Sequence, residues 1–294
     1  FYLANALRGS YNNNLNSSEK RQIITDAYEN RNSVSEIEKA LITSIYEQNV
    51  SRNLIKAEAA LNDITNKYPD YYYLWLYTGT FQNRVLLDPA KSELSWEKAL
   101  KIDPNNNMAK ILLSQLHYVT TEDFQLLTDD KIDQDKAISL IEDAEKNDQE
   151  NFTYSRLLGN IYRARGEFDK SLDAYSRATS LIENKQSSAY KQTLLISGHS
   201  YLFKEEYEKT REIYRASIEI DYRIGFDVNI TRWLANTYLY EKKYNEAVKE
   251  IDLLENRIVS NSTLDEIGKN DFLYRCDFER FITYGHSQMK EDAF

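Results

Sequence analysis

The 294-residue sequence contains few of the residues that interrupt regular structure or crosslink a chain. It has 8 Gly, 3 Pro and one cysteine, Cys276, so no internal disulfide can form. A lone cysteine fits a reducing compartment and leaves an oxidising one open. No apolar run reaches the roughly 18 residues that a membrane span needs. With 41% hydrophobic residues and so few helix breakers, the composition favours a helical protein with a core along its whole length.

Charge and motif content argue against several functions. The net charge is −10 and the pI about 5.0, which disfavours a protein that wraps nucleic acid, because phosphate binding needs a basic surface. The three histidines are far apart, and no phosphate-binding glycine loop or nucleophile motif occurs. The acidic stretch 129–135 lacks the central glycine and final glutamate of a calcium loop. We therefore expect no enzymatic activity, no cofactor and no metal site.

One pattern recurs along the chain at steps of roughly 34 residues. Its clearest copy is residues 154–182, where two segments with helical spacing are separated by Gly166. The first segment contains Leu158-Gly159-x-x-Tyr162 and the second Ser171-x-x-x-Tyr175. Each copy therefore predicts two amphipathic helices that fold back on each other.

This order of small and aromatic residues resembles the tetratricopeptide repeat. Further copies of this pattern are present, of varying completeness. Their small and bulky residues are Ala57 and Leu61, Gly79 and Trp96, Ser114 and Ile141, Gly198 and Tyr214, and Ala235 and Ile251. The resemblance covers about residues 34–260. It implies an all-α fold, a right-handed α-solenoid of about six helical hairpins with terminal capping helices.

Three regions are expected from this pattern. Residues 1–33 form an N-terminal arm and capping helix, 34–260 the repeat array, and 261–294 a C-terminal capping helix region. Within the arm we expect a helix end up to Arg8, a poorly ordered polar loop from Gly9 to Ser18, and a helix through Tyr28. Ser33 with Glu36 forms a capping-box pattern for the first repeat helix. The stretch from Thr120 to Asp133 interrupts the third hairpin and is expected to be an exposed excursion.

Candidate binding residues occur on the first helices of three repeats. Arg156, Asn160 and Arg163 share one helix face, and Arg232 and Asn236 occupy matching places two repeats later, with His199 between them. Tyr240 lies two turns beyond Arg232. The resemblance implies that this face lines a concave groove. It also implies a peptide clamp, but Leu195 and Leu202 replace the arginines of the intervening repeat, so a solvated face is the alternative interpretation.

The sequence predicts a non-catalytic scaffold that binds a peptide or protein segment in the groove. In a chain of charge −10, the arginines favour a segment with acidic groups, because guanidinium groups bind carboxylates. The alternatives are a sensory or regulatory module of a larger protein and a self-assembling repeat protein, so a homo-oligomer remains open. Because the sequence starts at Phe1, a preceding targeting or anchoring segment is conceivable. We expect a bacterial protein, and the sequence leaves its localisation open between the cytoplasm and the periplasm.

Overall fold

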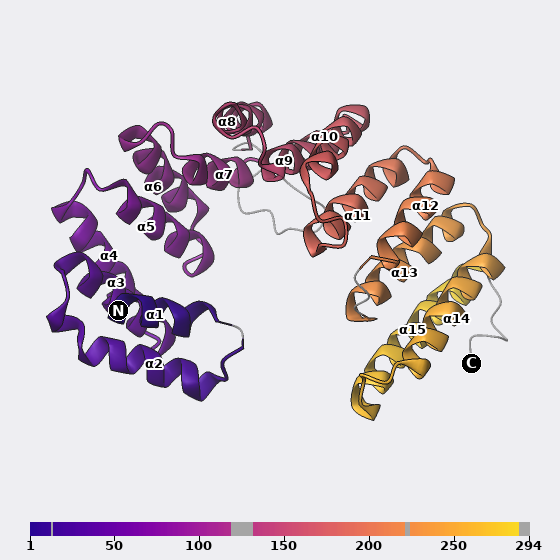
Figure 1. Cartoon of the computed structure of the whole chain (residues 1–294), viewed down its shortest axis with the longest axis horizontal. Helices are drawn as coiled ribbons and strands as arrows, with labels where there is room; N and C mark the ends of the chain where they lie inside the picture. The colour runs from indigo at the N-terminus through magenta and orange to yellow at the C-terminus, as the bar shows by residue number, and fades with distance from the viewer. Residues whose placement is uncertain (13, 119–131, 221–223, 288–294) are drawn as a thin grey trace. The chain divides into compact units, whose positions relative to one another are not determined.

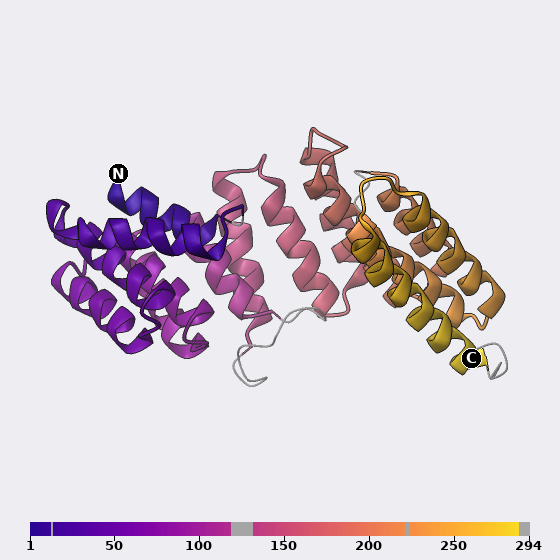
Figure 2. The same cartoon turned by 90° about the horizontal axis from the view of Figure 1, so that it is seen from below.

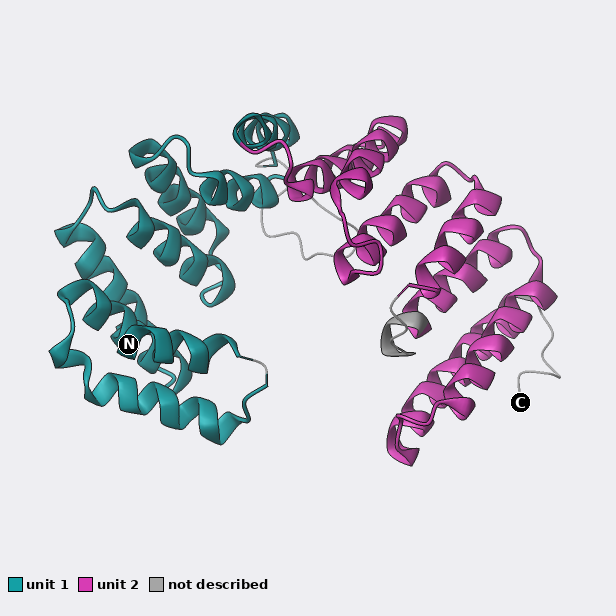
Figure 3. Cartoon of the chain, viewed as in Figure 1, with its two compact units in different colours: residues 1–147 teal, residues 148–294 magenta. Residues whose placement is uncertain are grey.

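The structure is a computed structural model that describes residues 1–12, 14–118, 132–220 and 224–287. These residues form fifteen α-helices and one short 3₁₀ turn, with no β-strand among them. The chain divides into two compact units, residues 1–147 and 148–294 (Figure 3). In each unit, helices that follow one another in sequence pack as antiparallel hairpins (Figures 1 and 2). The all-α, hairpin-based fold class predicted from the repeat pattern is confirmed.

The first unit contains four helical hairpins, which pair α1 with α2, α3 with α4, α5 with α6, and α7 with α8. Its helices are α1 (Tyr2–Tyr11), α2 (Ser17–Glu29), η1 (Arg31–Ser33), α3 (Glu36–Asn49), α4 (Leu54–Lys67), α5 (Tyr72–Arg84), α6 (Pro89–Ile102), α7 (Asn107–Leu116) and α8 (Gln134–Asn147). The expected excursion in the third repeat falls on residues 119–131, outside the described residues.

The second unit contains three hairpins and a final single helix, α15, which packs mainly on α14 and also contacts α13. Its helices are α9 (Phe152–Ala164), α10 (Phe168–Leu181), α11 (Ser188–Phe203), α12 (Tyr207–Ile218), α13 (Ile224–Tyr240), α14 (Tyr244–Ser260) and α15 (Glu266–Ser287). The last described segment, α15, is one continuous helix.

The N-terminal segment is more regular than the sequence suggested. The expected loop from Gly9 to Ser18 is present but shorter, because α1 continues through Tyr11, α2 begins at Ser17, and Gly9 is buried where α1 crosses α2. A Cβ at Gly9 would lie 2.7 Å from Ile24 Cγ1, so the two helices approach closely there. The helix through Tyr28 is confirmed, but its N-cap is Asn16 rather than a serine. Residues 2–29 thus form a seventh hairpin, which packs on α3.

The capping box of α3 lies two residues later than predicted. The side chains of Ser35 and Glu38 each bond the other residue's backbone N–H, whereas Ser33 lies in the 3₁₀ turn. Both Ser33/Glu36 and Ser35/Glu38 satisfy the sequence pattern of a capping box. The helix that the later pair caps buries Leu41, Ile42 and Ile45 in the core.

The turns inside five hairpins each contain one residue in the left-handed region. In the α9–α10 turn this residue is Gly166, with φ +76°, as its position in the pattern suggested. The equivalent turns use Arg52, Leu87, Glu205 and Lys242, with φ between 54° and 60°. Residues other than glycine rarely adopt this backbone conformation. These four turns are therefore strained, whereas the turn at Gly166 is not.

Helix spacing inside the hairpins follows a size rule. Gly79 lies against Trp96, Gly159 against Tyr175 and Gly198 against Tyr214, and a Cβ at any of the three glycines would lie 2.5–2.6 Å from the ring. Gly159 and Gly198 therefore sit at close helix crossings. Where the first helix has a larger residue, the second has a smaller one, as with Ala235 and Ile251, which share a core cluster. The residue sizes in each pair are therefore complementary.

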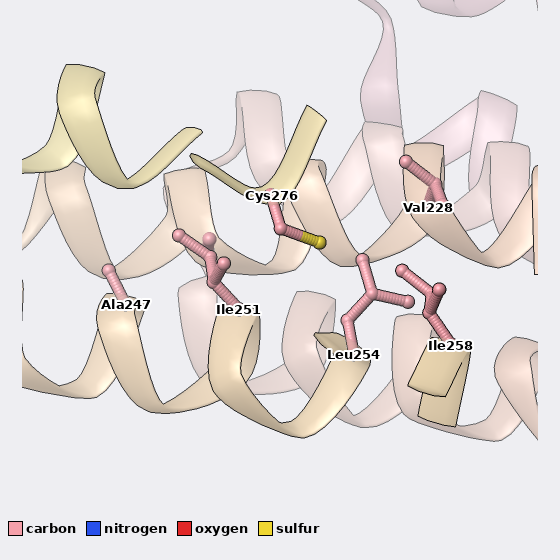
Figure 4. Packing of buried hydrophobic residues seen from close by; sticks show 7 residues of the cluster. Val228, Ala247, Ile251, Leu254, Ile258 and Cys276 are labelled. Atoms are coloured by element: carbon pink, nitrogen blue, oxygen red, sulfur yellow. The ribbon is translucent and has the colours of Figure 1, made fainter. Parts of the chain in front are cut away.

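The core of the last hairpin contains a sulfur atom. Cys276 of α15 is 2% exposed and packs with Val228, Ile251 and Leu254 of the hairpin beneath it (Figure 4). Burial raises the pKa of its thiol to about 11. Phe281 of the same helix is 49% exposed.

Candidate binding pocket

A cavity of about 700 Å³ in the second unit brings together three of the predicted binding residues. Its walls come from α13, from the start of α14 with the turn before it, and from α15. The lining residues are Arg232, Asn236, Leu239, Tyr240, Lys242, Tyr244, Phe278, Glu279, Ile282 and His286. Arg232, Asn236 and Tyr240 share a face of α13 because they follow each other at steps of four residues.

The pocket combines cationic donors with one carboxylate. Arg232 and Lys242 contribute positive charge, and Glu279 contributes negative charge. Burial raises the pKa of Glu279, and the nearby charge of Arg232 partly offsets this effect. Glu279 is therefore the acidic group near Arg232, and in its ionised form it would compete with a ligand carboxylate for that arginine.

The apolar part of the pocket is aromatic. Tyr240 is 62% exposed and stacks on Tyr207, with ring centroids 5.9 Å apart and an interplanar angle of 18°. Tyr207 belongs to α12, so the stack is anchored on the neighbouring hairpin. Phe278 on the α15 wall is also exposed, at 53%. Rigid aromatic rings provide apolar contact at a low cost in conformational entropy.

The predicted residues of α9 do not line this pocket. Arg156 is half-buried, and its guanidinium carbon lies 5.8 Å from the centre of the Phe152 ring. The Oδ1 of Asn160 accepts a hydrogen bond of 2.7 Å from the Tyr175 hydroxyl. Arg163 is 8% exposed, and its Nε has no hydrogen-bond partner among the described residues. Asn160 thus supports the close Gly159–Tyr175 crossing as well as sharing a face with the arginines.

His199 is buried between aromatic rings. It is 5% exposed, its Nδ1 lies 2.6 Å from the Tyr214 hydroxyl, and its ring meets Trp233 edge-on at 4.5 Å. Asn160 and His199 each follow the crossing glycine and each bonds the tyrosine that covers it. A role of these two residues in binding stays a prediction.

The sequence interpretation missed the α15 half of the pocket. Phe278, Glu279, Ile282 and His286 were assigned to a capping region, where no groove face was expected. A signal was present, because Gly285-His286-Ser287 repeats Gly198-His199-Ser200. In that alignment His286 corresponds to His199, and Asn236 of α13 occupies the same position of the repeat pattern.

Comparison with known proteins identifies the fold only. No protein-family model and no curated protein matches the chain. The C-terminal part of a TPR repeat-containing protein from Cytophaga hutchinsonii matches with a TM-score of 0.57 and 12% identity, over 93% of this chain and 99% of that one. Yeast Tom70 matches with a TM-score of 0.51 and 15% identity, over 99% of this chain and 64% of that one. The chain therefore has the tetratricopeptide-repeat fold.

Among the described residues, no helix is both long and apolar enough to span a bilayer. The same part of the chain contains no cluster of three or more histidine, cysteine, aspartate or glutamate side chains that could hold a metal ion.

Proposed function

We propose that this protein is a non-catalytic interaction scaffold and that the pocket between α13 and α15 binds an extended peptide segment carrying acidic and aromatic or apolar side chains. The observation that carries the proposal is the convergence of Arg232, Asn236 and Tyr240 on one cavity of about 700 Å³. Cavities of this size are typical of ligand sites.

The chemistry of each wall matches one part of such a segment. The guanidinium of Arg232 can bind a carboxylate in a bidentate manner, and Lys242 adds a second positive charge at the same rim. The amide of Asn236 can both donate to and accept from a peptide backbone. Tyr240 and Phe278 provide apolar contact for a neighbouring side chain. The tetratricopeptide fold supports this role, since stacked hairpins leave extended surfaces for binding.

The test is a selection of displayed random peptides on the intact chain, followed by calorimetry on the enriched peptides. We expect enrichment of peptides that combine Asp or Glu with aromatic residues. Arg232→Ala should weaken their binding about tenfold, and added salt should weaken it in the wild type. Glu279→Gln should strengthen binding, because it removes the carboxylate that competes for Arg232.

The matched control is Arg257→Ala, which removes an arginine of α14 that pairs with Glu219 and does not line the pocket. It should leave peptide affinity unchanged. If Arg232→Ala and Arg257→Ala behave alike, or if Glu279→Gln weakens binding, the pocket is not the peptide site.

A further inference from the structure

The end of α15 repeats a short sequence of α11, a helix that is covered by the second helix of its own hairpin. Gly285-His286-Ser287 is identical to Gly198-His199-Ser200 of α11. In α11 the glycine lies under Tyr214 of α12, whose ring carbon Cε1 would be 2.6 Å from a Cβ at Gly198. At Gly285, by contrast, an added Cβ meets no described heavy atom within 4 Å.

The same second-helix pattern covers a crossing glycine in three hairpins. Gly79, Gly159 and Gly198 are covered by the aromatic residues of Ser92-x-x-x-Trp96, Ser171-x-x-x-Tyr175 and Thr210-x-x-x-Tyr214. In the two hairpins where this residue is a tyrosine, its hydroxyl bonds the side chain that follows the glycine, Asn160 or His199. A helix that covers Gly285 would place its tyrosine hydroxyl next to His286 in the same way.

The outer face of α15, defined by Ile267, Tyr274, Phe278 and Phe281, is apolar and exposed. These four side chains are 81%, 71%, 53% and 49% exposed. They follow each other at steps of seven, four and three residues, so they share one helix face with Gly285. Such a face is typical of a surface that binds another helix.

The opposite end of the chain behaves differently. Every exposed residue of α2 is polar, from Ser17 and Glu19 to Asp26 and Glu29. A polar outer face is what a terminal repeat needs for solubility. The exposed face of α2 is therefore polar, whereas the outer face of α15 is apolar and carries the glycine pattern of a first hairpin helix.

We propose that the outer face of α15 binds an amphipathic helix of a partner polypeptide that carries Ser or Thr and, four residues later, Tyr. The tyrosine ring covers Gly285, its hydroxyl bonds His286, and the apolar side of the helix covers Phe278 and Phe281. The site is distinct from the interior of the pocket, although Phe278 and His286 border both.

The chain itself supplies the probe. A peptide of residues 206–219, the α12 sequence, contains Thr210-x-x-x-Tyr214. Its exposed Glu212 is replaced by lysine, and a lactam between that amine and the carboxyl group of the exposed Glu208 holds the peptide helical. Titrated by fluorescence anisotropy against the full chain, it should bind saturably. Gly285→Leu in the chain, or Tyr214→Ala in the peptide, should weaken binding about tenfold or more, since either removes the close crossing. Leu253→Ser, which alters an exposed apolar residue of α14 outside this face, should not.

A double-mutant cycle tests the polar contact. The Tyr214→Phe peptide should bind the wild-type chain several-fold more weakly than the parent peptide does. The two peptides should bind the His286→Ala chain with equal affinity, because the tyrosine hydroxyl has no partner there. Absence of saturable binding up to about 1 mM peptide overturns the proposal, as does unchanged binding to Gly285→Leu. The chain could instead bind no peptide but form concentration-dependent dimers that Gly285→Leu abolishes. That result would overturn the proposal and identify a second copy of the chain as the occupant.

Discussion

The same substitution at two glycines of this chain should have opposite effects on stability. Gly159 and Gly285 both lie in helices, so replacing either by leucine raises helix propensity by up to about 0.8 kcal/mol. At Gly285 the described structure leaves room for the side chain. Gly285→Leu should therefore be neutral or stabilising by about 0.5 kcal/mol, since the residue lies near a helix end where propensity counts less.

At Gly159 the space is occupied. A Cβ would lie 2.5 Å from both Cδ1 and Cε1 of Tyr175, whereas ordinary contacts begin at 3.4 Å. The ring cannot move freely, because Tyr175 is fully buried and its hydroxyl donates to Asn160. Overpacking of this kind costs about 1–3 kcal/mol, and leucine adds three further carbon atoms. We expect a net loss of about 2 kcal/mol from Gly159→Leu, after the gain in propensity.

The assay is urea denaturation followed by circular dichroism, with comparison of midpoints and slopes. A rescue variant sharpens it: Gly159→Ala combined with Tyr175→Ile recreates the pairing of Ala235 with Ile251 in this same chain. The double variant should be more stable than the sum of its single changes predicts, by about 0.5–3 kcal/mol. Equal shifts for the two leucine variants, or strict additivity in the double variant, would refute the size rule.

Three smaller predictions follow from single sites. Leu87→Gly should stabilise the chain by about 0.5–1 kcal/mol in the same denaturation assay, because Leu87 has φ +54° and is 69% exposed. Cys276 should react with a thiol reagent at pH 8 only after unfolding, because burial raises its pKa to about 11; fast reaction of the folded chain would contradict the packing. Glu93 is desolvated, but its ion pair with Lys136 outweighs this and lowers its pKa, so the destabilisation caused by Glu93→Gln should be present at pH 7 and shrink as the pH falls below about 4.

Much of the fold follows from local patterns of residues. The hairpins beyond residue 34 were predictable because small and aromatic residues recur in a fixed order, and each must face the other helix of its pair. Gly159 and Gly198 are the clearest cases, since the residue type itself reports a close crossing. In the first hairpin the loop was predicted too long, because the polar residues there, including three consecutive asparagines, suggested a loop that begins at Gly9, although Gly9 is a crossing glycine of the same kind.

The α13 wall of the candidate pocket was predictable for the same reason. Arg232, Asn236 and Tyr240 recur at steps of four residues, and helical periodicity alone places them on one face. Periodicity does not report how deep a side chain lies. His199 occupies the matching place one repeat earlier, yet it is buried because Tyr214 and Trp233 close over it.

The sequence by itself thus determined the helices, their pairing and which residues share a face, because these depend on spacing along the chain. The tertiary structure decided which of those faces meet a cavity. Glu279 and His286 line the pocket only because α15 packs beside α13 and α14. That packing depends on contacts such as Cys276 with Leu254, between residues more than twenty positions apart, whose shapes must fit in three dimensions.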